Sequence, residues 1–262
     1  MSIRKNGMFG KLIGDRQFYR KVLMISIPIM IQNGITNFVN LLDNIMIGRV
    51  GTVQMSGAAI VNQLLFVYNL CIFGALSGAG IFTAQYYGQG DQEGVRKTFR
   101  FKLWITTILT LGTVVLFLAA GPALIGIYLK GEGTPEDAAA ILHYGQLYMR
   151  LMLVGLPAFM ISQTYADTLR ECGETMLPMK AGLISIFVNL IFNYLLIYGK
   201  LGLPAMGVAG AAAATVLARY VEALIIVVIA HRSAAEDSFL RGLYRTMRVP
   251  GELCLRIVIK GT

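Results

Sequence analysis

An aspartate, Asp43, lies inside an apolar stretch of the sequence that is long enough to cross a lipid bilayer. Residues 22–47 contain no other charged side chain. An ionisable group within a membrane segment costs roughly 2.5–3.5 kcal/mol on insertion scales, so such a group usually serves a function. A buried carboxylate offers one kind of chemistry above all, which is reversible neutralisation by a proton or a sodium ion. We therefore expect Asp43 to be a cation-coupling residue.

A narrow stripe of polar residues runs along the same segment toward Asp43. Its members precede Asp43 by three, seven, ten and eleven positions. At about 100° per residue, these offsets fall within an arc of about 80° on a helix. Lipid cannot satisfy their hydrogen-bonding groups, so the stripe must face other protein or a water-filled cavity. The candidate cavity or substrate residues of this stripe are Gln32, Asn33, Thr36 and Asn40.

A second polar group, Asn189 and Asn193, lies in the apolar segment 177–198. Their spacing of four places both on one helical face. Asn193 and Asp43 each precede, by five or six residues, a glycine that ends the segment, so at about 1.5 Å per residue they should lie at similar depth. If both segments line one cavity, the carboxylate and the carboxamides converge there. Alternatively, the asparagines only bond across helices as packing contacts, worth about 0.6 kcal/mol each.

The remaining polar residues give no sign of an enzyme. Arg219 and Glu222 lie three positions apart in the last apolar segment and are expected to form a structural ion pair. The histidines and the three cysteines lack metal-ligand spacing, and HExxH, GxSxG and Walker A motifs are missing. We expect no catalytic residues and no cofactor beyond the coupling ion, H⁺ or Na⁺. A possible Na⁺ site comprises Asp43, Asn189 and Asn193.

The composition indicates an all-α integral membrane protein. Of the 262 residues, 56% are hydrophobic and only 14% are charged, whereas soluble domains carry about 25% charged residues. Short loops should place consecutive helices as antiparallel neighbours in one bundle. Six segments reach the roughly 20 residues that a spanning helix needs: 22–47, 55–87, 103–129, 141–166, 177–198 and 208–230.

The distribution of the 23 Lys and Arg residues predicts the orientation. Most fall in the N-terminal arm (1–21), in the second and fourth loops and in the tail (233–262), while the alternate loops hold few. The positive-inside rule then places both termini in the cytoplasm of a multi-pass cell-membrane protein. The net charge of +9 is thereby explained by the lipid bilayer rather than by nucleic acid. The tail reads as a cytoplasmic connector that follows a six-helix lobe (22–232) and leads toward a second lobe.

Four stretches resemble the multidrug and toxin extrusion (MATE) transporters, in their order and spacing over residues 21–232. The resemblance implies the N-terminal six-helix lobe of a twelve-helix transporter with two lobes. It also implies export of organic, often cationic, compounds in exchange for H⁺ or Na⁺ by alternating access. The stretches are AQYYGQGDQEGVRK (84–97), DTLRECGETMLPM (167–179), FVNLIFNYLLIYG (187–199) and GVAGAAAATVLARYVE (207–222).

The same resemblance assigns roles to particular residues. Asp43, within NLLDNIMIG, falls on the first-helix aspartate that serves as the coupling site in prokaryotic members. A polar constellation in the fifth helix falls on Asn189 and Asn193. Some relatives carry an aspartate at the latter position, so this chain has one carboxylate fewer. A polar position of the fourth helix falls on Gln163, which the resemblance implies as a further cavity residue.

Two other functions stay open at this point. Distant relatives of similar architecture flip lipid-linked sugars, which would require a cavity dominated by basic residues. Only Arg150 and Arg219 lie inside the apolar segments of this chain. The other possibility is a non-transporting six-helix protein that binds a partner or lipid, and it predicts no ion-dependent change in substrate binding.

Overall fold

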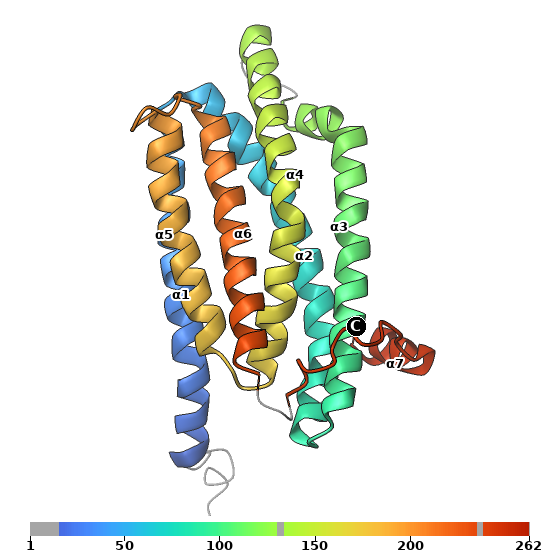
Figure 1. Cartoon of the computed structure of the whole chain (residues 1–262). Helices are drawn as coiled ribbons and strands as arrows, with labels where there is room; N and C mark the ends of the chain where they lie inside the picture. Colours follow the sequence, from blue (N-terminus) through green and yellow to red (C-terminus); the bar gives the residue numbers. More distant parts are fainter. Residues whose placement is uncertain (1–15, 130–133, 235–237, 262) are drawn as a thin grey trace, which may run out of the picture.

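The computed structural model describes residues 16–129, 134–234 and 238–261. Every regular element in these ranges is a helix (Figure 1), which confirms the all-α fold. Five of these helices, α2 to α6, are long and apolar enough to cross a membrane. The elements are α1 (Arg16–Gly48), α2 (Thr52–Gly88), α3 (Gln92–Tyr128), α4 (Pro135–Glu171), α5 (Met176–Tyr198), α6 (Val208–Arg232) and the short α7 (Gly251–Gly261).

Several helices extend beyond the apolar segments that predicted them. The third begins at Gln92 rather than at 103, because the Asp91 side chain accepts a hydrogen bond from the Gly94 amide (2.9 Å). Thr134 caps α4 in the same way, so this helix begins well before residue 141. Such caps satisfy amides that the first helical turn leaves free. Hydropathy marks the bilayer core, whereas capping residues decide where a helix begins.

The first helix lies at one side of the bundle. With 33 residues it is long enough to span a bilayer, and it includes the apolar stretch Val22–Ile35. It packs mainly against α5, with fewer contacts to α2 and α6. It begins at Arg16, so the end of the expected N-terminal arm is helical, while residues 1–15 of that arm lie outside the described ranges.

The fourth helix runs through the middle of the bundle and packs against α2, α3 and α6. Its closest approach to α2 is at Gly57 and Gly145, where a Cβ atom on Gly57 would lie 2.8 Å from the Gly145 nitrogen. Small residues of this kind let two membrane helices approach backbone to backbone. The larger hydrophobic core surrounds this crossing and includes Val61, Ile125 and Leu156, all fully buried.

One end of the bundle carries the N-terminus of α1, the α2–α3 and α4–α5 turns, and α7 (Figure 1). These are the segments in which most Lys and Arg residues occur. One of the basic residues expected in a loop, Lys102, is instead fully buried within α3. Its Nζ atom contacts the carboxylates of Asp167 at 2.9 Å and Glu171 at 2.5 Å. This cluster joins α3 to α4.

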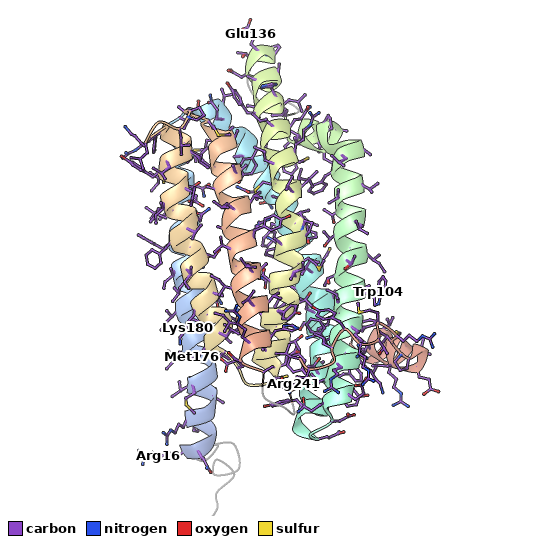
Figure 2. All side chains as sticks on the ribbon, in the orientation of Figure 1. Arg16, Trp104, Glu136, Met176, Lys180 and Arg241 are labelled. Carbon is purple, nitrogen blue, oxygen red and sulfur yellow. The ribbon has the colours of Figure 1, made fainter. Side chains whose placement is uncertain are left out.

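The connector after α6 is folded against the bundle. Three donors on one face of α3, spaced by four residues, bind its backbone carbonyls. Figure 2 labels Trp104, the last of them, beside this segment. The connector's own side chains Phe239, Leu240 and Leu243 are buried against the bundle. The bonds run from Arg96 Nε (3.1 Å), Arg100 Nε (2.9 Å) and Trp104 Nε1 (3.2 Å) to the carbonyls of Phe239, Leu243 and Met247, respectively.

Candidate functional site

A polar cavity of about 520 Å³ lies among α1, α2, α4, α5 and α6. The packing that forms it follows from the helix contacts above, because α5 and α6 lie side by side and α1 packs against α5. The cavity brings together residues from three separate predicted groups: the first-helix stripe, the fourth-helix position and the fifth-helix asparagines. The predicted residues that line it are Gln32, Asn33, Asp43, Gln163 and Asn189.

At one end of the cavity, Asp43 meets the asparagines of α5. The Asn193 side chain donates a hydrogen bond to Asp43 Oδ1 at 2.5 Å. The amide of Asn189 lies 3.2 Å from both Asp43 oxygens, and with its nitrogen turned toward them its oxygen accepts from Thr215 Oγ1 at 3.2 Å. The carboxylate of α1 thus meets side chains of α5 and, through Asn189, of α6.

The surroundings of Asp43 supply amides and oxygens but no cationic side chain. Among the described residues, no Lys, Arg or His nitrogen lies within 4.0 Å of its carboxylate. Asn193 is 0% exposed, and its Oδ1 atom has no hydrogen-bond partner within the described chain. Carboxylate, carbonyl and hydroxyl oxygens are the ligands of hard cations. Asp43, Asn189 and Asn193 therefore bring a carboxylate and two carboxamides together, with oxygens of the type that Na⁺ binds and a carboxylate that can take a proton.

Two predicted members of the stripe, Thr36 and Asn40, lie within α1, but their side chains are outside what the structure describes. The polar cavity residues that the sequence analysis did not single out include Asn69, Arg170 and Thr215. Thr215 and Asn69 could have been found by the rule that singled out Asp43, because each is a polar residue inside an apolar segment. Arg170 follows its apolar segment in the sequence, yet its Nη2 atom reaches Gln32 Oε1 at 3.0 Å.

The expected ion pair between Arg219 and Glu222 is not formed. No ion pair within 4.0 Å joins them in the part of the chain that the structure describes. The guanidinium of Arg219 lies instead over the ring of Phe159, 5.0 Å from its centroid. Helical side chains lean toward the helix N-terminus, so Arg219 leans away from a partner three residues later. An acid that precedes its base pairs better than the reverse order found here.

The second basic candidate, Arg150, is exposed and does not line this cavity. It borders a separate groove beside Phe117 and Leu153. The charged residues of the cavity are two acids, Asp43 and Glu222, and two bases, Arg170 and Arg219. The cavity is thus not dominated by basic residues, as binding of a lipid-linked sugar phosphate would require.

Comparison with known proteins gives consistent results. The model of the MatE family matches residues 28–195. A probable multidrug resistance protein NorM of Thermotoga maritima is 30% identical over 210 residues, which cover 79% of this chain and 43% of that protein. The NorM protein of Bacillus licheniformis is 27% identical over 224 residues, 86% of this chain and 48% of that protein. The chain therefore spans about half the length of the curated relatives that it matches.

Solved structures show the same fold. A MATE structure in a bent conformation has a TM-score of 0.77 and 22% identity, and the match covers 93% of this chain and 51% of that one. An outward-facing MATE transporter structure gives a TM-score of 0.77 and 23% identity, with 92% and 51% covered. In each case the six-helix bundle corresponds to about half of the matching structure.

Proposed function

Because this chain belongs to the MatE family of membrane transporters, we propose that it forms the N-terminal half of a cation-coupled exporter of organic, mainly cationic, compounds. The multidrug resistance names of its relatives support this function. The half-length match supports a functional unit that includes a second six-helix lobe, supplied by the same polypeptide or by another chain. The basic loops gathered at one end support a cytoplasmic position for both termini.

The observation that carries this proposal is the geometry of Asp43. Its carboxylate lines the cavity, accepts a hydrogen bond from Asn193, and has no basic partner within 4.0 Å among the described residues. In such a site a cationic compound and a coupling ion compete for one negative charge. Binding of H⁺ or Na⁺ neutralises the carboxylate and removes the cost of its burial. The ion then favours the conformation in which the cavity collapses and the compound leaves.

This mechanism follows the general rule that a ligand shifts a conformational equilibrium only through its different affinities for the two states. The ionised, open cavity binds the organic cation from the cytoplasm. The neutralised, outward-facing cavity binds it poorly and releases it. Return of the ion to the cytoplasmic side restores the charged site. At the position of Asp43 a single carboxylate is neutralised, because its neighbour Asn193 carries no charge.

Replacement of Asp43 tests the proposal directly. Asp43→Asn keeps the shape and the hydrogen-bonding capacity of the side chain but removes its negative charge. We expect the variant to insert normally and to lose ion-driven efflux, measured with an organic cation in proteoliposomes under imposed pH or Na⁺ gradients. The matched control is Glu136→Gln at the exposed tip of α4 (Figure 2), which should retain efflux. Wild-type efflux by Asp43→Asn at equal protein content would refute the assignment.

A further inference from the structure

The cavity that contains Asp43 also contains two guanidinium groups, those of Arg170 and Arg219, and among the described residues neither forms an ion pair within 4.0 Å. The carboxylate of Glu222 lines the same cavity and interacts with both electrostatically without a direct contact. The ion pairs of the described residues join Arg96 and Arg100 to Glu93, and Lys102 to Asp167 and Glu171. None of these pairs involves Arg170 or Arg219, although both arginines line the cavity.

The two arginines contact uncharged side chains, and some of their N–H groups have no hydrogen-bond acceptor among the described residues. Arg219 stacks on Phe159, and Arg170 donates to Gln32 through Nη2. Nη1 of Arg219 and Nε of Arg170 are buried and have no hydrogen-bond partner in the described chain. Buried donors of charged groups are almost always paired, so an unpaired one in a cavity wall calls for a ligand. A planar guanidinium is best completed by a carboxylate, which accepts two parallel hydrogen bonds.

The positions of the charges suit a molecule that carries both signs. Thr215, which contacts Asn189 beside Asp43, precedes Arg219 by four residues, a rise of about 6 Å along α6. Asp43 and Arg219 therefore lie about one helical turn apart in depth, on the wall of one cavity. Its volume, about 520 Å³, falls within the range of pockets that bind drug-sized ligands.

We propose that Arg219, supported by Arg170, forms an anion subsite, so that the cavity selects organic zwitterions. The cationic group of the compound faces Asp43, and its carboxylate faces Arg219. The inference rests on the proposed export function and adds the substrate class. It gives a partner to the buried donors of the two arginines, which the carboxylate of Glu222 in the same cavity leaves without a hydrogen bond.

A pair of matched dyes tests this subsite. Rhodamine B carries a cationic xanthene and a free carboxylate, and its ethyl ester keeps the cation but lacks the carboxylate. Binding of each is measured by fluorescence anisotropy with the purified protein in lipid nanodiscs, with empty nanodiscs subtracted. Because one charge-assisted hydrogen bond is at stake, we expect Arg219→Gln to weaken rhodamine B binding by roughly tenfold or more. Binding of the ester should stay unchanged or tighten.

Two variants control for nonspecific effects. Arg150→Gln removes an exposed arginine of α4 outside the cavity and should alter neither dye. Arg219→Lys keeps the positive charge and should retain most of the preference for rhodamine B. Equal weakening of both dyes by Arg219→Gln would overturn the proposal, because it would indicate a structural role. Unchanged binding of both dyes would overturn it as well.

Asp43→Asn separates this inference from the proposed function. If the export mechanism is correct, this variant weakens binding of both dyes, since both carry the cation. Loss of ester binding in Asp43→Asn, combined with no effect of Arg219→Gln on rhodamine B, would leave the exporter intact and refute the anion subsite. Binding of both dyes that is insensitive to Asp43→Asn would instead refute the coupling role of Asp43.

Discussion

Asn193 is the residue on which the behaviour of Asp43 depends most. It is fully buried, donates to Asp43 at 2.5 Å, and leaves its own oxygen without a partner. Its nitrogen stabilises the ionised carboxylate, and its oxygen is available to a bound cation. A relative with aspartate at this position would have two negative charges to neutralise. In the proposed mechanism, the single carboxylate at this position makes the neighbouring amides more important for ion binding.

We predict that Asn193→Ala weakens Na⁺ binding roughly tenfold or more, because a hydrogen bond to a charged group contributes about 1.5–3 kcal/mol. Isothermal titration of the purified protein with NaCl, at constant ionic strength, measures the change. Ser162→Ala is the control, since Ser162 is also fully buried but bonds only the Phe159 carbonyl of its own helix. Unchanged Na⁺ affinity in Asn193→Ala would exclude this amide from the ion site.

Lys102 shows how a charged residue can be structural. Its ammonium group is fully buried and lies between the carboxylates of Asp167 and Glu171. Gly80 of α2 makes room for this cluster, because a Cβ atom there would collide with Oε1 of Glu171. The sequence places Lys102 among the basic residues that follow a loop, and nothing in its local pattern signals burial.

Lys102→Met should destabilise the protein by up to about 3–5 kcal/mol, because it leaves two partly buried carboxylates without their counter-charge. Thermal unfolding in detergent measures the loss. Adding Glu171→Gln to Lys102→Met should recover part of it, since one of the two uncompensated charges is then removed. Lys97→Met, on the same helix but in no ion pair of the described residues, should have little effect. A stable Lys102→Met protein would show that the cluster contributes no net stability.

Among the helices, α2 and α4 approach each other backbone to backbone at Gly57 and Gly145. Gly57→Ala should destabilise the protein by about 1–3 kcal/mol, because the added methyl group meets the backbone of Gly145 at 2.8 Å and overpacks the contact. The matched control is Gly74→Ala in the same helix, where no atom lies within 4 Å. That change should be neutral or stabilising, since alanine favours helix. Equal unfolding temperatures of the two variants would contradict a tight backbone contact between α2 and α4 at Gly57.

The connector is the second feature at the level of helices and loops. Arg96, Arg100 and Trp104 bind its carbonyls at spacings of one helical turn along α3. Tyr244 of the connector also bonds the hydroxyl of Tyr165 and stacks on His231. A polar, glycine-containing segment therefore has a fixed path, set by donors that precede it by more than 140 positions in the sequence.

For the whole molecule, the orientation in the membrane gives a prediction about accessibility. In a background with Cys71, Cys172 and Cys254 replaced by serine, we introduce one cysteine at Lys200 or at Arg241, both exposed and at opposite ends of the bundle (Figures 1 and 2). A membrane-impermeant maleimide should label Lys200→Cys in intact cells and Arg241→Cys only after permeabilisation. The reverse labelling pattern would show that the predicted orientation in the membrane is wrong.

The membrane-spanning helical fold, the family and the candidacy of Asp43 can all be read from the amino-acid sequence. In lipid every backbone polar group must be satisfied within the segment, so composition and length suffice to identify spanning helices. A polar stripe is also a local pattern, readable from the spacing of residues in one segment. Asp43, Gln32, Asn33, Gln163 and Asn189 were singled out in this way or by resemblance, and the structure places all five on one cavity.

Which of these side chains meet, and which others join them, becomes visible in the packed helices. Asn193 contacts Asp43 across 150 positions of sequence, Thr215 completes the group through Asn189, and Arg170 reaches into the cavity from the end of α4. Spacing alone favoured an Arg219–Glu222 pair that does not form. The physical reason is that contacts between helices depend on their rotation and crossing, which many distant residues set together and no local pattern encodes.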